Sequence, residues 1–210
     1  MCIRDRTNKV LGSNSIDLDG TDDTYLNMNN VLNAMEGTGT ISFWVRSEGV
    51  SGSYPITWNR SDTGAVTFLH VSAEHTPKYC QCELVINNTT QWKVRSPADS
   101  WESTDRGWKH IVLTQDGTNV KFYWQGTEVT SFETSTDKSK WISDLTGRDN
   151  VRFGVKNVYG QGNVGEFEGQ VDDMAIWTRA ITAAEVTTLY GGGQASGTPK
   201  SALDISRTGL

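Results

Sequence analysis

Apolar and polar residues alternate along most of the chain, so that every second side chain points to the same side of an extended backbone. Within residues 40–46, Ile41, Phe43 and Val45 share one face and Trp44 lies on the other. This period of two is typical of β-strands. Because both faces carry large apolar side chains, we expect this strand to lie centrally in a sheet, with both faces at least partly covered.

Residues 108–129 contain three such segments joined by two tight turns. The turns fall at Asp116-Gly117 and Gln125-Gly126. A polar residue followed by glycine between alternating segments is a strong signal for a short hairpin turn. The stretch therefore predicts a β-meander of three antiparallel strands.

Further alternating segments follow at the spacing of a β-sandwich, separated by turns rich in Asn, Asp, Gly and Ser. Together they predict an all-β protein built from two stacked antiparallel sheets. The other segments are residues 15–19, 56–58, 65–71, 80–86, 91–94 and 151–155.

One segment near the end of the chain changes the parity of its apolar positions. The apolar residues up to Val171 are odd-numbered, whereas Met174 and Ile176 are even-numbered. One extra residue must therefore be inserted at Asp172-Asp173, which predicts a β-bulge.

A single short helix is expected after the last strand. Thr182 and Glu185 form a capping box, in which each side chain bonds to the backbone amide of the other, and Ile181 and Val186 form a hydrophobic staple. The glycine at position 191 marks the end of the helix. We expect this helix to pack on the sandwich and close it.

Composition narrows the classes of partner. The chain has 210 residues, a length that suits one all-β domain, and a net charge of -6 without a cluster of Lys or Arg. Such a surface repels phosphate backbones, so we expect no nucleic-acid partner. No run approaches the roughly 20 apolar residues that cross a bilayer, so we expect no membrane insertion. Cys80 and Cys82 fit core or half-buried thiols better than a disulfide framework or a zinc site.

The domain is expected to occupy residues 14–190. Residues 1–13 are expected to be a leader that is adaptor-derived or truncated, because the first six residues resemble a translated sequencing-library adaptor and lack the apolar stretch of a signal peptide. Residues 191–210 are expected to be a linker or the start of a missing segment.

Four blocks, residues 16–23, 40–45, 108–126 and 167–180, resemble the laminin-G-like jelly roll of the concanavalin A-like lectin/glucanase superfamily. The order and spacing of the blocks carry this resemblance more than any single block does. It implies a two-sheet antiparallel jelly-roll sandwich, rim loops or a concave face that bind sugars or proteins, and often one Ca²⁺.

The superfamily also contains glucanases. For an enzyme of this kind the resemblance implies catalytic carboxylates on one strand, in a Glu-x-Asp-x-x-Glu or Glu-x-Asp-x-Glu run. No such run is present, and although Glu166 and Glu168 share a face, Asp172 lies beyond the predicted bulge. The sequence also lacks a Gly-x-Ser-x-Gly elbow, and His110 fits a hydrogen-bonded structural role. We therefore predict that the protein is not an enzyme.

A structural Ca²⁺ is the cofactor to consider, because this ion prefers six to eight oxygen ligands and the chain has acidic turns. The resemblance implies that the first and last strands are neighbours, which would bring two acidic groups together. The alternative is that Asp-rich turns only stabilise the backbone. The expected ligands are Asp19, Asp22 and Asp23 in the first turn, and Asp172 and Asp173 at the bulge, with Asp19 and Asp172 foremost.

Tryptophans beside polar loops are the best candidates for sugar contacts, because a sugar stacks its apolar face on an aromatic ring and hydrogen-bonds through its rim. Trp44, Trp108 and Trp177 lie in strand segments and are expected in the core. For the others, packing at the rim remains the alternative, since scattered surface aromatics are common. The predicted ligand-binding residues are Trp58, Asn59, Arg60, Trp92, Trp101, Trp141, Tyr159 and Asn163.

These observations predict a non-catalytic carbohydrate-binding or adhesion module of a larger extracellular, cell-surface or virion protein, whose partner is a glycan or a cell-surface or virion protein. Two alternatives stay open: a structural decoration or fibre domain without glycan binding, and a glycoside hydrolase of the same fold.

Overall fold

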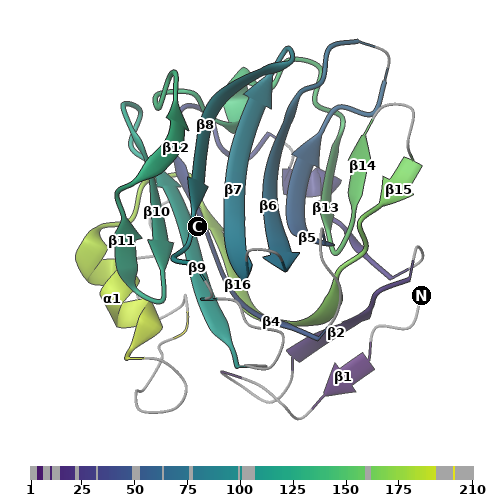
Figure 1. Ribbon diagram of the computed structural model, residues 1–210, viewed down its shortest axis with the longest axis vertical. Coiled ribbons are helices and arrows are strands. Elements are labelled where there is room, and N and C mark those ends of the chain that lie inside the picture. The colour runs from purple at the N-terminus through teal and green to yellow at the C-terminus, as the bar shows by residue number, and fades with distance from the viewer. Residues whose placement is uncertain are drawn as a thin grey trace.

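The computed structural model describes residues 4–6, 10, 15–21, 24–31, 33–48, 53–62, 64–75, 78–98, 100, 107–158, 162–192 and 201. Within these residues, two antiparallel sheets stack on each other, and one helix packs beside the sandwich (Figure 1). The predicted all-β, two-sheet sandwich is confirmed.

The first sheet contains the predicted meander and, at its centre, the strand with two apolar faces. That strand is β4, and it lies between β16 and β9 as expected for a segment covered on both sides. In order of pairing, the described strands of this sheet are β1 (Arg4–Arg6), β2 (Ser15–Asp19), β16 (Glu168–Trp177), β4 (Gly39–Ser47), β9 (Lys109–Gln115), β10 (Val120–Trp124) and β11 (Thr127–Val129).

The second sheet faces the viewer in Figure 1, with the β14–β15 hairpin at the right beside β13 and β5. Its described strands, in order of pairing, are β12 (Phe132–Ser135), β8 (Thr89–Arg95), β7 (Lys78–Ile86), β6 (Phe68–His75), β5 (Ser53–Asn59), β13 (Asn150–Phe153) and β3 (Leu26–Asn27). The hairpin consists of β14 (Lys156–Val158) and β15 (Gly162–Val164), and two 3-10 helices, η1 (Asn29–Val31) and η2 (Ile142–Asp144), lie in the connections.

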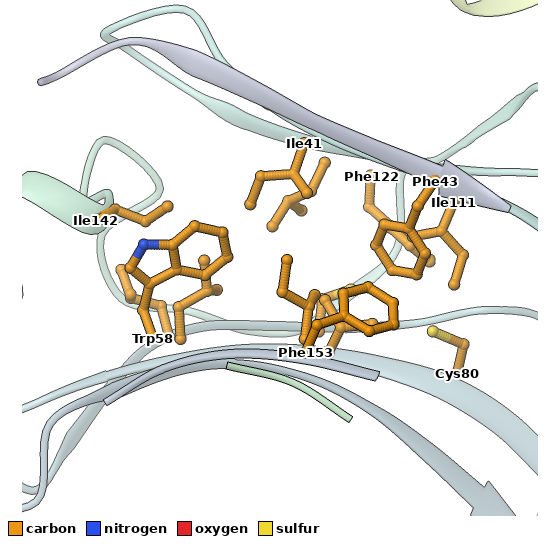
Figure 2. Close-up of a cluster of buried hydrophobic side chains, with 14 of the residues drawn as sticks. Ile41, Phe43, Trp58, Cys80, Ile111, Phe122, Ile142 and Phe153 are labelled. Carbon is orange, nitrogen blue, oxygen red and sulfur yellow. The ribbon is translucent and has the colours of Figure 1, made fainter. Parts of the chain in front are cut away.

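The main core fills the space between the two sheets. Figure 2 shows Ile41, Phe43 and Phe122 from the first sheet facing Trp58 and Phe153 from the second. The rings of Phe43 and Phe153 meet edge to face, with centroids 5.7 Å apart at 87°, a favoured aromatic geometry. Cys80 and Cys82 are buried free thiols in this core, as predicted.

The predicted capping box starts helix α1 (Ala183–Tyr190). Thr182 Oγ1 accepts a hydrogen bond from Glu185 N at 3.2 Å, and Glu185 Oε2 accepts one from Thr182 N at 2.8 Å. The helix ends at Gly191, whose φ of 57° is left-handed. Its apolar side packs with Trp177 and neighbours in a second cluster on the first sheet. No helix in the described part of the chain has the length and apolar character needed to span a membrane.

The predicted bulge interrupts the pairing of β16 with β4. Asp172 pairs with Trp44 and Ala175 with Ser42, so the register shifts between them, and Asp173 has a positive φ of 43°. The change in apolar parity at this point therefore has the predicted structural cause.

The first sheet extends into the segment expected to be a leader. Strand β1 pairs with β2, with Arg4 opposite Asp17. Of the expected linker, only residues 191, 192 and 201 belong to the described part of the chain.

Candidate functional site

Three of the predicted sugar platforms are buried, so the prediction that they form exposed platforms is wrong. Trp58, Trp92 and Trp141 each have 0% of their surface exposed. Trp58 lies two residues from Ile56 on the inward face of β5 (Figure 2), while Trp92 stacks on Trp141 with ring centroids 6.5 Å apart. An indole enclosed on both faces has no surface left for a sugar. Two other predicted contacts, Trp101 and Tyr159, lie outside the described residues.

The remaining predicted contacts take different places. Asn59 is fully buried on the outer side of β5, and Arg60 lines a groove on that side. Asn163 lies in β15, where its Oδ1 accepts hydrogen bonds from Arg152 and, at 2.9 Å, from Asn157. The structure therefore brings Asn59 and Arg60 to one region, while Asn163 takes part in holding the hairpin.

The groove lies on the outer face of the second sheet, opposite the core. On β6, Leu69 and Val71 point inward, so Phe68, His70 and Ser72 point outward. The hollow measures about 220 Å³, below the roughly 300–1,000 Å³ of pockets for drug-sized ligands, so it suits a single ring in an open groove. We call it the outer groove; its lining includes Tyr54, Val66, Phe68, His70, Glu83 and Lys156.

One wall of the outer groove is apolar. Val66 is 48% exposed, the only large hydrophobic side chain so exposed among the described residues, and Phe68 is half-buried beside it. The ring of Phe68 stacks on that of His70. An exposed aliphatic group next to an aromatic ring presents a flat surface to a ligand with an apolar face.

A cation reaches the groove from the β14–β15 hairpin. Nζ of Lys156 donates to the hydroxyl of Tyr54 at 3.1 Å and lies 4.5 Å from the centroid of the same ring. None of its ion pairs or hydrogen bonds within the described residues involves a carboxylate. The ammonium group therefore retains a positive charge that an anionic ligand group can neutralise.

The only carboxylate among the described lining residues is Glu83. Its Oε1 accepts a hydrogen bond from Thr90 Oγ1 at 3.1 Å and its Oε2 one from Gln81 Nε2 at 3.3 Å. The register places Glu83 directly opposite His70. Glu83 thus supplies acceptors at the edge of the groove away from Lys156.

His70 forms part of the floor. It is 6% exposed, and Tyr54 meets it edge to face with ring centroids 4.9 Å apart. Burial, and secondarily the charge of Lys156, lowers the pKa of His70 well below its ordinary 6.5. The imidazole is therefore neutral at neutral pH.

A second, shallower hollow lies along β11 at the edge of the first sheet. It measures about 570 Å³ and is lined by Trp124, Glu128 and Val129 among others. Trp124 is only 7% exposed, and no cation lines this hollow among the described residues. It therefore lacks both the aromatic surface and the charge found in the outer groove.

The predicted calcium ligands fall into two separate groups. Strands β2 and β16 do lie side by side, but Asp19 pairs with Glu168 and Ile16 with Val171. Asp172 thus lies four positions away from Asp19, which separates their Cα atoms by about 13 Å along the strands. Two oxygen ligands of one Ca²⁺ lie within roughly 5 Å of each other. Asp19 and Asp172 do not fit one site.

Other partners occupy these carboxylates. Asp19 accepts hydrogen bonds from Thr21 and Thr24, which lower its pKa. Asp172 Oδ2 accepts from the backbone N of Val10 at 2.8 Å, and Asp173 Oδ1 from Ser201 Oγ at 3.1 Å. Asp22 and Asp23 lie outside the described residues, and within the described ones no three His, Cys, Asp or Glu side chains form a metal-binding group.

The sequence-based prediction missed Phe68, His70, Glu83 and Lys156. One signal was present: residues 68–71 alternate, with Leu69 and Val71 marking the opposite face as the core side. No comparable signal exists for Lys156, because its place depends on how a distant hairpin packs against β5.

Comparisons with known proteins agree with this architecture. A laminin-G-type family model, described as the concanavalin A-like lectin/glucanases superfamily, matches residues 19–187. No curated protein sequence matches the chain.

Three solved structures illustrate the similarity. The CBM40 of a Ruminococcus gnavus IT-sialidase, bound to α2,3-sialyllactose, has a TM-score of 0.69 at 16% identity, over 88% of this chain and 100% of that one. The NanB sialidase of Streptococcus pneumoniae has 0.69 at 17%, over 86% of this chain but 28% of its own. A pentraxin of Limulus polyphemus has 0.56 at 16%, over 91% and 89%. At such identities the likeness shows a shared fold.

The family match covers most of the chain, and the topology agrees with the jelly roll that the sequence blocks imply. This protein therefore belongs to the concanavalin A-like lectin/glucanases superfamily.

Proposed function

We propose that this protein is a non-catalytic carbohydrate-binding module and that the outer groove is its binding site. The observation that carries the proposal is the combination of an apolar wall, Val66 and Phe68, with hydrogen-bonding groups on rigid strands. A sugar ring has the same combination of an apolar face and a polar rim. Pockets with this composition, apolar with a few well-placed polar groups, are the usual form of small-ligand sites.

The charge of Lys156 favours an anionic glycan. Its ammonium group has no carboxylate partner among the described residues and faces the groove. The CBM40 structures of the R. gnavus IT-sialidase hold α2,3- and α2,6-sialyllactose, each of which carries one carboxylate. Sialyllactose is therefore the first ligand to test.

The number of carboxylates in the groove supports binding without catalysis. Glycoside hydrolysis by the common mechanisms needs two carboxyl groups on either side of the scissile bond. Among the described residues only Glu83 supplies one to the outer groove. We propose further that the module acts outside the cell, on a cell surface or on a virion, where several weak sites displayed together give useful avidity.

The test is a glycan array followed by calorimetric titration with α2,3-sialyllactose, α2,6-sialyllactose and lactose. We expect the two sialylated sugars to bind at least about tenfold more tightly than lactose, since a charge-assisted hydrogen bond contributes roughly 1.5–3 kcal/mol. Lys156→Met should abolish this preference. The matched control is Lys121→Met, because Lys121 lies on β10 of the other sheet. An array without any bound glycan would refute the proposal.

A further inference from the structure

Three buried side chains beneath the outer groove, Thr57, Asn59 and His70, form a hydrogen-bonded chain whose direction is fixed by the backbone. Thr57 donates its hydroxyl proton to the carbonyl oxygen of Val155 at 3.1 Å. A threonine hydroxyl has one proton, so toward Asn59 it acts as the acceptor. Nδ2 of Asn59 donates to it at 2.8 Å.

Asn150 gives an independent reason for the same orientation. Its Nδ2 donates to Asp149 Oδ1 at 2.7 Å and to the carbonyl oxygen of Asn157 at 3.3 Å, both of which only accept. Its own Oδ1 is left to accept from Asn59 Nδ2 at 3.4 Å. Two separate partners therefore fix which end of the Asn59 carboxamide is the nitrogen.

The oxygen of that carboxamide consequently faces His70. Oδ1 of Asn59 and Nε2 of His70 are within hydrogen-bond distance. Because an amide oxygen only accepts, Nε2 must carry the single proton of the neutral ring. Nδ1 then has a lone pair, and no hydrogen bond joins it to any residue in the described part of the chain.

We propose that Nδ1 of His70 is a permanent hydrogen-bond acceptor in the floor of the outer groove, and that it selects glycans with an O–H or N–H donor at that point. The inference rests on the proposed function, because it assigns a specificity to the same groove. It names the chemistry of the ligand group: a sugar hydroxyl or an acylamino N–H, placed within reach of a carboxylate held by Lys156.

The same arrangement disfavours any ligand that presents an acceptor there. An O-methylated hydroxyl would place an oxygen lone pair against Nδ1, and His70 has no second proton to offer. In such a complex neither the buried acceptor of the protein nor the facing group of the ligand has a hydrogen-bond partner. This cost is why sites of this kind discriminate strongly between ligands with and without the donor. His70 is thus a specificity-determining residue.

The first experiment needs no ligand. Long-range ¹⁵N–¹H NMR spectra of the free protein at pH 7.5 distinguish a protonated from an unprotonated ring nitrogen. We expect Nε2 of His70 to carry the proton and Nδ1 to be unprotonated. A proton on Nδ1, or a mixture of both tautomers, would overturn the inference whatever the protein binds.

The second experiment combines ligand and protein changes. Titrations use α2,3-sialyllactose and analogues that each lack one hydroxyl, or in which the acylamino N–H is methylated. One analogue should bind the wild-type protein about tenfold more weakly. The His70→Gln variant keeps an N–H in reach of Asn59 but has no Nδ1, so it should bind that analogue and the parent sugar with equal affinity. Which analogue shows this behaviour tells whether the donor is a hydroxyl or an acylamino group.

The outcomes separate the inference from the proposed function. Suppose that α2,3-sialyllactose binds and that Lys156→Met weakens this binding, but that every analogue still binds the His70→Gln variant more weakly than the parent sugar, by the same factor as it does the wild-type protein. The inference is then wrong and the proposed function stands. If neither sialyllactose nor any array glycan binds, the proposed function and the glycan specificity both fall, while the NMR experiment still decides the tautomer.

Discussion

Phe68 and His70 stack face to face, with ring centroids 3.8 Å apart and planes 9° from parallel. The two residues are separated by one position on β6, so the strand itself places both rings on the outer face. His70 is buried and hydrogen-bonded from below, whereas Phe68 is half-buried. The stack therefore holds the half-buried ring of Phe68 against a rigid support.

Replacing this ring tests the groove directly. We expect Phe68→Ala to weaken binding of α2,3-sialyllactose by about tenfold, because stacking on an aromatic ring contributes roughly 0.5–1.5 kcal/mol beyond burial. The matched control is Phe132→Ala at the far edge of the same sheet, a half-buried ring with Lys138 Nζ 4.1 Å from its centroid. Equal losses in both variants would place the binding site elsewhere.

Stability should fall as the pH is lowered from about 6.5 to 5. Burial lowers the pKa of His110 to about 3 and also lowers that of His70, so as the pH falls below about 6.5 the unfolded chain binds protons at these imidazoles that the folded protein does not. Stability then rises with pH in this window and is constant above it. For His110 the loss at pH 5 is about 2 kcal/mol.

Urea unfolding at pH 7.5, 6, 5.5 and 5 measures this effect. The carboxylates whose pKa is lowered do not obscure it, because their stabilising contribution is present above their ordinary pKa values of 3.8 for Asp and 4.5 for Glu; the largest of these shifts is that of Glu185, whose pKa Arg179 lowers to about 2. His110→Gln should make the pH dependence shallower by close to one proton. A free energy of unfolding that stays constant from pH 7.5 to 5 would contradict the burial of both imidazoles as neutral groups.

Gly169 is a position where the fold requires the absence of a side chain. Its φ is +154°, and a Cβ there would lie 2.2 Å from the carbonyl oxygen of Arg46 on the paired strand β4. We expect Gly169→Ala to cost at least about 2 kcal/mol, from backbone strain together with separation of the two strands. Gly162→Ala is the control for strain alone, because its φ is +69° and nothing lies within 4 Å. Thermal unfolding of both variants gives the comparison, and equal Tm losses would argue against the close contact.

The calcium hypothesis now depends on the first turn. Since Asp172 lies about 13 Å along the strands from Asp19 and accepts from Val10 N, we expect Asp172→Asn to leave any calcium-dependent rise in Tm unchanged, and Asp19→Asn to abolish it. The measurement is thermal unfolding in CaCl₂ and after chelation. Loss of the response in both variants would contradict the separation, and a wild-type Tm indifferent to calcium would end the hypothesis.

Local patterns predicted the elements of the fold well. Alternation placed Ile41, Phe43 and Val45 in the core, the change of parity located the bulge at Asp172, and the Thr182–Glu185 pair marked the start of the helix. Each is a short-range property, in which geometry along a strand or helix determines which side chains meet.

The tryptophans show where prediction from neighbouring residues failed. Trp58 follows Ile56 by two positions and shares its inward face, but its polar neighbours Asn59 and Arg60 suggested a loop. Asn59 is nevertheless fully buried, because Thr57, Asn150 and His70 satisfy its carboxamide. A polar residue therefore did not mark an exposed segment, since its partners come from three different strands.

The sequence alone determined the class of the protein, the central strand, the bulge and the capped helix, because alternation and capping each depend on residues that are only a few positions apart. Only the tertiary structure decided where a ligand can bind. The outer groove joins β5, β6 and β7 to Lys156 of a hairpin that follows β5 by about a hundred residues, and the proton on His70 is assigned by a carbonyl oxygen at Val155. Such long-range placements follow from strand order and register, which no local pattern specifies.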